Sequence, residues 1–263
     1  MLFSVLFFHV FMATLTLAAP ATSGEQAGTA PIAATVTVPA ASTVAQDVDT
    51  NNWAGLALTV GSNAAVRSVT GAFTIPTPAV PPGGNSHEVY ESAAWIGIDG
   101  YNCDSALLRT GVTFIYANGD VNANAWYEWY PSVDRTYYDI KVSIGNLITA
   151  SVTAYTPQSG TVTLINNSTG AQTSVALGNA DYAALCMNSV EYIVGDTTQP
   201  NGAGPSLPIP DFGTLAFSDA FVSLTPSASP LTDLLNIVQD GAALTSVSTE
   251  YDTITIKYIG DSE

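Results

Sequence analysis

Basic residues are scarce in this sequence. Its 263 residues include five Lys and Arg against 22 Asp and Glu, for a formal net charge of −17 at pH 7. Nucleic acid and anionic membranes are therefore poor partners. A chain with few Lys and Arg also has few ion pairs to lose when carboxylates protonate, and its self-repulsion falls as the pH approaches its pI of about 4.1. The composition thus favours an acidic working medium.

Histidine and cysteine are also rare, with two of each. His9 lies in an apolar N-terminal run, which leaves His87 alone. A lone histidine is more often a solvated loop residue than a metal ligand, and a Ser-His-Asp triad would need this one. No Gly-x-Ser-x-Gly turn or phosphate-binding glycine loop is present. We therefore expect no metal and no cofactor. Cys103 and Cys186 predict one disulfide in an oxidising compartment.

The N-terminal apolar run is short for a membrane span. Residues 2–17 are almost wholly apolar, and Ala18, Ala19 and Pro20 follow, as in a secretory signal peptide. Residues 19–48 are rich in Ala, Thr, Ser, Val, Pro and Gly and have no aromatic side chain, which predicts a flexible pro-segment or linker. We thus expect a signal peptide over 1–18, this segment over 19–48, and one domain over 49–263. The mature protein is expected to be secreted, extracellular and monomeric.

Long amphipathic helical periodicity is absent, and residues 180–187 offer a short helical turn at best. Short segments rich in β-branched and aromatic residues instead follow one another, separated by Gly, Pro, Asn and Asp. This pattern predicts an all-β jelly roll or sandwich, with a long surface loop over 197–210. The expected strands are 55–59, 66–75, 88–98, 107–116, 123–130, 141–144, 147–156, 160–166, 173–176, 190–194, 214–224, 235–238, 246–250 and 253–258.

Three of these strands, between Ala93 and Tyr130, carry aromatic and polar residues at alternate positions. Alternate residues of a strand share a face. The faces so predicted are Trp95, Gly97 and Asp99; Arg109, Gly111 and Thr113; and Trp126, Glu128 and Tyr130. An aromatic surface with a few convergent polar groups predicts a ligand groove, and paired carboxylates there would also suit glycoside hydrolysis.

Glu191 stands inside the otherwise apolar strand Val190–Val194. One interpretation is a strand carboxylate facing solvent. The other is a buried carboxyl with a raised pKa that serves in acid–base chemistry.

Elsewhere, Asn166 and Asn167 begin overlapping N-glycosylation sequons at a predicted hairpin tip.

Several of these segments together resemble, in order and spacing, the fungal glutamic peptidases, or eqolisins. The resemblance runs from about Asn52 to Tyr258, and its main motifs are Ala94-Trp-Ile-Gly-Ile-Asp-Gly100, Leu108-Arg-Thr-Gly-Val112, Trp126-Tyr-Glu-Trp-Tyr-Pro131 and Val190-Glu-Tyr-Ile-Val194. It implies a concanavalin A-like jelly-roll β-sandwich of two large antiparallel sheets. It also implies a secreted acid endopeptidase that needs neither metal nor cofactor.

The resemblance assigns a catalytic Gln–Glu dyad, in which Glu activates water and then protonates the leaving amine. The Glu position matches Glu191, but the Gln position is Arg109 in this sequence. Thr113 stands where the family has Asp, and Tyr192 where it has Trp. Cys103 and Cys186 match the family disulfide. The positions that match the family's substrate groove are Trp53, Trp95, Asp99, Trp126, Glu128 and Tyr130.

Arg109 leaves two functions open. Its planar N–H donors suit an oxyanion, which favours a working peptidase. Its positive charge, however, is expected to lower the pKa of Glu191, and an ion pair between the two would block the water site. Arg also has no acceptor for a proton of that water. The alternative is therefore a catalytically impaired homologue that binds peptide or glycan in the same groove.

Overall fold

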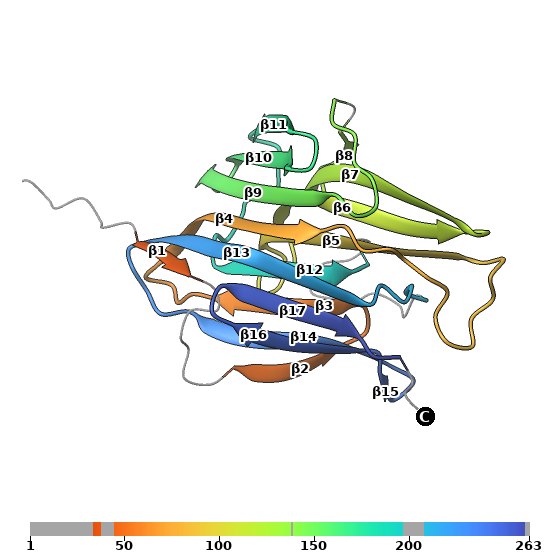
Figure 1. Cartoon of the computed structure of the whole chain (residues 1–263). Coiled ribbons are helices and arrows are strands. Elements are labelled where there is room, and N and C mark those ends of the chain that lie inside the picture. Colours follow the sequence, from red (N-terminus) through yellow and green to blue (C-terminus); the bar gives the residue numbers. More distant parts are fainter. Residues whose placement is uncertain (1–33, 38–44, 138, 197–207, 261–263) are drawn as a thin grey trace, which may run out of the picture. The chain divides into compact units, whose positions relative to one another are not determined.

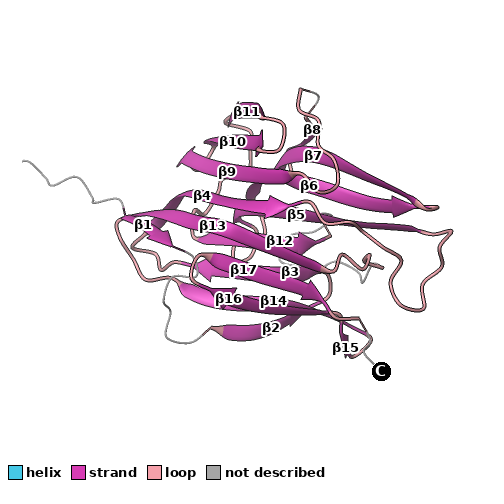
Figure 2. Cartoon of the chain, viewed as in Figure 1, coloured by secondary structure: helices cyan, strands magenta, loops and turns pink. Residues whose placement is uncertain are grey.

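The computed structural model describes residues 34–37, 45–137, 139–196 and 208–260. Within these ranges the chain forms strands, turns and loops, and no helix is present (Figure 2). The described part therefore offers no helix of the length and apolarity that a membrane span requires. The predicted signal peptide lies outside the described residues, as does most of the predicted loop over 197–210.

The first sheet has eight strands, in the order β11-β10-β9-β4-β13-β17-β16, with β1 paired to β13 (Figure 1). Its strands are β1 (Ala34–Thr37), β4 (Ala65–Thr74), β9 (Leu147–Thr156), β10 (Ser159–Asn166), β11 (Ala171–Gly178), β13 (Thr214–Thr225), β16 (Thr245–Glu250) and β17 (Thr253–Tyr258).

The second sheet has nine strands, in the order β15-β14-β3-β12-β5-β6-β7-β8, with β2 paired to β14. Its strands are β2 (Gln46–Thr50), β3 (Trp53–Thr59), β5 (Val89–Asp99), β6 (Leu107–Ala117), β7 (Asp120–Tyr130), β8 (Val133–Thr136), β12 (Ser189–Gly195), β14 (Leu231–Gln239) and β15 (Ala242–Ala243).

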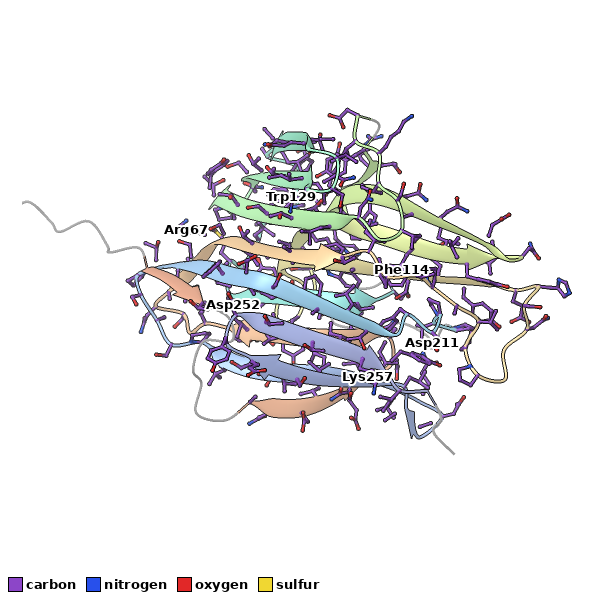
Figure 3. The ribbon with its side chains drawn as sticks, viewed as in Figure 1. Arg67, Phe114, Trp129, Asp211, Asp252 and Lys257 are labelled. Atoms are coloured by element: carbon purple, nitrogen blue, oxygen red, sulfur yellow. A yellow bond between two sulfur atoms is a disulfide. The ribbon has the colours of Figure 1, made fainter. Side chains whose placement is uncertain are left out.

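Apolar side chains from both sheets meet in one core. Phe73 and Phe217 pack edge to face at 5.3 Å between ring centroids, and Phe114 and Trp129 contribute from the second sheet (Figure 3). Tyr192 reaches across the core from β12, and its hydroxyl donates to the carbonyl of Thr70 at 2.8 Å. Alternation along β9 and β10 directs one face of each strand inward. The expected β-sandwich of two large, mainly antiparallel sheets is confirmed.

Most of the expected strands are present, but the strand expected over 141–144 is wrong. Gly145, with φ of 82°, forms a turn there, in which Ser143 N donates to Asn146 Oδ1 at 3.0 Å. The short alternating run Lys-Val-Ser-Ile before a glycine suits a strand and a packed loop equally well, so the pattern alone does not separate them.

Two pieces of the segment expected to be flexible are strands. β1 pairs antiparallel with β13, and β2 pairs parallel with β14. A strand added at a sheet makes main-chain hydrogen bonds and needs little apolar patterning, which explains why composition misses it. The expectation of flexibility is therefore wrong for 34–37 and 46–48, while removal of the segment stays a prediction.

Candidate active site

Four residues form a row across the second sheet. Glu191 on β12 pairs with Gly97 on β5, and Gly97 pairs with Arg109 on β6. Arg109 in turn pairs with Glu128 on β7. Directly paired residues lie on the same face of a sheet. The neighbours of Glu191 on its own strand, Val190 and Tyr192, belong to the core, so this row lies on the opposite face.

Gly97 stands in the middle of this row, and the side chains around it close over its Cα atom. A Cβ atom at this position would lie 3.0 Å from Glu191 Oε2 and 3.2 Å from Arg109 Cβ. The same Cβ atom would lie 2.9 Å from Leu107 Cδ1, so any side chain larger than hydrogen would force these neighbours apart. Glu191 and Arg109 stand on strands two apart, roughly 10 Å between backbones. Glycine therefore lets Glu191, Arg109 and Leu107 pack closely over β5.

Glu191 is fully buried on this face. Its Oε1 accepts the Tyr101 N–H at 2.9 Å and the Ser189 hydroxyl at 3.4 Å. Its Oε2 has no hydrogen-bond partner among the described residues. Burial raises the pKa of Glu191 well above its ordinary value, and the charge of Asp99 raises it further, against smaller lowering effects that include Arg109. One oxygen of the carboxyl is thus fixed by hydrogen bonds, and the other is available for proton transfer.

Arg109 pairs with Glu128 rather than with Glu191. Its Nε donates to Glu128 Oε2 at 2.6 Å, and its guanidinium carbon lies 5.0 Å from the Trp95 ring centroid and 5.3 Å from that of Trp126. No hydrogen bond or ion pair joins Arg109 to Glu191 in the described part of the chain. The expected lowering of the Glu191 pKa by Arg109 exists, but burial outweighs it. The reason is register, because Glu128 lies directly opposite Arg109 and Glu191 does not.

The tryptophans predicted for the groove come together beside this row. Trp53 and Trp95 pack edge to face at 5.3 Å, and Trp126 lies 6.3 Å from Trp95. Trp53 Nε1 donates to the Asp196 carbonyl at 2.9 Å, whereas Nε1 of Trp95 and Nε1 of Trp126 have no partner among the described residues. Tyr130 packs against the same cluster. Trp53, Trp95, Trp126, Glu128 and Tyr130 thus lie together on the face that carries Glu191.

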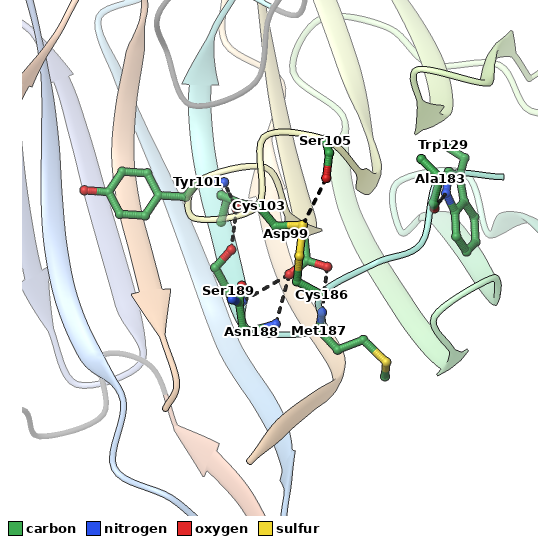
Figure 4. The surroundings of a disulfide bond; sticks show 11 residues. Asp99, Tyr101, Cys103, Ser105, Trp129, Ala183, Cys186, Met187, Asn188 and Ser189 are labelled. Atoms are coloured by element: carbon green, nitrogen blue, oxygen red, sulfur yellow. Dashed lines mark hydrogen bonds between the residues drawn. A yellow bond between two sulfur atoms is a disulfide. The ribbon is translucent and has the colours of Figure 1, made fainter. Parts of the chain in front are cut away.

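Asp99 differs from the expectation that it lines the groove. It is fully buried, and its carboxylate accepts the backbone N–H groups of Met187 at 2.8 Å, Asn188 at 2.9 Å and Ser189 at 3.3 Å (Figure 4). Its φ of 68° ends the alternation of β5, so its side chain leaves the face of Gly97. Asp99 therefore fixes the segment that leads into Glu191.

The predicted disulfide between Cys103 and Cys186 is present, across 83 residues of sequence. A loop of this length corresponds to roughly 4–5 kcal/mol in the chain-entropy model. The bond joins the turn that contains Tyr101 to the segment before Ser189 (Figure 4). Both residues that hold Glu191 Oε1 are therefore tied to the same crosslink.

Tyr101, Ser189 and Asp233 were not predicted from the sequence as parts of the site. Tyr101 contacts Glu191 through its backbone N–H. Almost every residue carries this group, so no side-chain pattern marks it in the sequence. The phenol of Tyr101 lies beside the Asp233 carboxylate on β14, and burial and this neighbour raise its pKa to about 12. The loop of Tyr101 is thereby attached to a strand on the other side of β3 and β12.

Two hollows flank the row of Glu191. One, of about 320 Å³, contacts Glu128 and Trp126 and extends along β5 to β8. The other, of about 180 Å³, contacts Asp233, Thr59 and Asn102. In the described part of the chain no three His, Cys, Asp or Glu side chains are arranged to hold a metal ion.

The two sequons differ in exposure. Asn166 is buried, and its Nδ2 donates to the Lys141 carbonyl at 3.0 Å and to Asn146 Oδ1 at 2.8 Å. The folded chain cannot present this side chain to a glycan, so the expectation for Asn166 is corrected. Asn167 is exposed, and its glycosylation stays a prediction.

Three carboxyls with raised pKa values predict stability in acid. Burial is the main cause at Glu191, Asp99 and Glu91. Because the folded state binds these protons more tightly, their stabilising contribution is complete below the unfolded pKa of about 4 and is lost as the pH rises through the folded values. We expect the melting temperature to be higher at about pH 3–4 than at pH 7, as scanning calorimetry would show. A melting temperature that climbs from acid to neutral pH would contradict this.

Comparison with known proteins places this site in a family. The model of the Peptidase A4 family matches residues 51–258. Aspergillopepsin-2 from Aspergillus niger is 34% identical over 226 residues, covering 80% of this chain and 78% of its own. Scytalidopepsin B from Scytalidium lignicola is 31% identical over 215 residues, with the same coverage.

Solved structures agree with the sequence comparisons. The crystal structure of scytalido-glutamic peptidase with a peptide-based transition state analog is 30% identical, with a TM-score of 0.65, and covers 80% of this chain and 98% of its own. That of aspergilloglutamic peptidase from Aspergillus niger is 34% identical, with a TM-score of 0.56, and covers 65% of this chain and 99% of its own. The chain belongs to the Peptidase A4 family, the glutamic peptidases or eqolisins.

Proposed function

We propose that this chain is a secreted acid endopeptidase of the glutamic class in which Glu191 is the general base. The proposal rests on Glu191 Oε2, which is buried, has no hydrogen-bond partner among the described residues and lies over Gly97. A water molecule beside Oε2 would give its proton to this atom as its oxygen attacks the peptide carbonyl. The carboxyl then returns the proton to the leaving nitrogen as the C–N bond breaks, which yields a carboxylic acid and an amine.

Arg109 takes the place of the family's Gln in this proposal. Its guanidinium is held by Glu128 and the two tryptophan rings, so it supplies a fixed positive charge for the oxyanion. It offers no acceptor for a proton of the water, so Glu191 alone must orient that molecule. We therefore expect slower hydrolysis than with a Gln at this position.

The alternative function is binding of peptide or glycan without cleavage. It is favoured by the lack of an acceptor on Arg109 and by the tight Arg109–Glu128 pair, which restrains the guanidinium. In this function the hollow lined by Trp126, Asn124 and Thr136 would hold the ligand.

Digestion of a denatured protein distinguishes the two functions. Because the pKa of Glu191 is raised, its carboxylate form grows as the pH rises above about 4.5, and the assay should cover pH 3 to 6. New N-termini identified by mass spectrometry support the peptidase. Retention of the substrate on the folded protein without any new terminus supports the binding function.

Tyr101→Phe should disturb the site without removing any group that contacts Glu191. The variant keeps the backbone N–H but loses the hydroxyl that interacts with the Asp233 carboxylate. A looser N–H stabilises the Glu191 carboxylate less, so we expect a few-fold lower kcat/KM and an ascending pH limb displaced to higher pH. Asp233→Asn should produce a smaller displacement in the same direction. An unchanged pH profile in both variants would show that this contact does not position Glu191.

A further inference from the structure

The tip of the β10–β11 hairpin carries the two overlapping sequons, and the fold separates them. Along β10, Thr163 and Ile165 face outward, and Asn167 continues this alternation on the outer face. Asn166 faces inward, and its Nδ2 donates to the Lys141 carbonyl at 3.0 Å, which leaves no room for a sugar. Asn167 is exposed. The second sequon alone is therefore compatible with the folded chain.

Asn167 lies beside the start of β9, on the outer face of the first sheet. Its backbone N–H donates to the Leu147 carbonyl at 2.8 Å, which extends the pairing of β10 with β9 by one residue. Its side-chain Nδ2 donates to the Thr149 hydroxyl at 2.7 Å. The nitrogen that would carry a sugar is thus directed across β9, along the surface of the sheet.

The surface beneath this nitrogen combines apolar and hydroxyl side chains. Leu147 is 40% exposed, and Ile165, which pairs with Thr149, is half-buried on the same face. A pyranose ring has an apolar C–H face and a rim of hydroxyls. Its C–H face would remove the apolar surface of Leu147 and Ile165 from water, while its hydroxyls could bond to Thr149. The surface therefore suits a sugar attached at Asn167.

This part of the sheet carries no charge. The whole chain has 22 acidic residues, but none of the residues of β9, β10 and β11 is Asp, Glu, Lys or Arg. These three strands lie side by side at one end of the first sheet (Figure 1). On the other side of β9, Leu147 pairs with Thr74 and Thr149 with Ala72, which are also uncharged. A neutral oligosaccharide can cover this face without the cost of desolvating a charge.

We propose that Asn167 carries an N-linked glycan whose first sugar lies over Leu147 and Ile165, on the outer face of β9 and β10. Transfer joins Asn167 Nδ2 to C1 of that sugar and breaks the bond between C1 and a phosphate oxygen of a lipid-linked oligosaccharide diphosphate. The lipid diphosphate and one amide proton are released. Nδ2 keeps one N–H, which still donates to Thr149. The glycan requires the secretion that the proposed function includes, but no catalysis.

Two substitutions test the site while keeping both asparagines. Thr169→Ala removes only the sequon of Asn167, and Ser168→Ala removes only that of Asn166. Each protein is purified from the medium of a eukaryotic host, behind a host signal peptide if its own does not direct it there. Mass spectrometry before and after enzymatic removal of N-glycans should find a glycan at Asn167 in the natural chain and in Ser168→Ala, and none in Thr169→Ala. A bare natural chain, or a glycan at Asn166, overturns the site.

Thermal unfolding tests the contact with the sheet. The glycan is trimmed to one N-acetylglucosamine, and the melting temperature is compared with that of Thr169→Ala. The same pair made in a bacterial periplasm, without glycan, gives the effect of Thr169→Ala itself. We expect the sugar to raise the melting temperature by about 2–4 °C, the shift from a modest surface contact in a domain of this size.

A matched pair of variants locates this contact. Leu147→Ser should reduce the gain from the sugar, because it removes apolar surface beneath the ring. Tyr155→Ser, which alters a 61% exposed side chain near the other end of β9, should preserve it. No gain in the natural chain, or an equal gain in Leu147→Ser, overturns the contact.

The proposed function can fail independently of the glycan. A chain that carries the glycan at Asn167 but never cleaves a peptide contradicts the peptidase and leaves the glycan in place. A chain that cleaves peptides and is recovered bare from the medium contradicts the glycan and leaves the peptidase in place.

Discussion

Glu191→Gln is expected to lower kcat/KM by about 10²–10⁴-fold, the range for loss of a general base. Gln has nearly the same shape, and its carbonyl oxygen can still accept the Tyr101 N–H. It cannot take a proton from water at any pH in the working range. The loss should appear in kcat as well as in kcat/KM, because the proton is transferred in the transition state.

The same substitution has an effect on stability that separates folding from catalysis. The charged form of Glu191 is disfavoured by burial, so at neutral pH the neutral amide should raise the melting temperature. An inactive variant that melts higher than the natural protein at pH 7 cannot be inactive through unfolding. A folded variant with half the natural activity or more would contradict the role of Glu191.

Arg109→Gln is expected to raise peptidase activity, by about the 10²–10³-fold that one oxyanion-hole donor contributes in other enzymes. Gln supplies both an amide donor for the oxyanion and a carbonyl acceptor for the water. Thr113, where the family has Asp, is expected to limit the gain.

The pH dependence of Arg109→Gln follows from the charge that it removes. Arg109 is among the groups that lower the pKa of Glu191, so its loss raises that pKa further and moves the ascending limb of kcat/KM to higher pH. Arg109→Lys is the matched control, since it keeps a positive charge without the planar N–H donors and should not raise activity. No gain from Arg109→Gln at any pH between about 2 and 6, in a folded protein, would favour the binding function.

Strand alternation predicted one face of the site correctly. Trp95, Arg109, Trp126 and Glu128 share that face because side chains alternate with a period of two along each strand. Alternation does not give the register between strands, and register decides that Arg109 meets Glu128 rather than Glu191. The resemblance to the eqolisins supplied the positions of the dyad, which the pattern alone did not contain.

Two kinds of feature were not predicted from the sequence, and each has a physical reason. Asp99 was placed in the groove because alternation was extended by one residue into a position with positive φ. Tyr101, β1 and β2 contribute through main-chain groups, which every residue carries and no composition marks. Both errors arose where backbone conformation, rather than side-chain chemistry, determines the contact.

The central claim is that Glu191 activates water for peptide hydrolysis, and the pH profile of kcat/KM between pH 2 and 7 tests it most directly. For the natural protein and one peptide substrate, we predict an ascending limb whose midpoint lies above 4.5, because the free enzyme must hold Glu191 as the carboxylate. Glu191→Gln, measured on the same peptide, should show no such limb. Equal kcat/KM for the two proteins at every pH would contradict the claim.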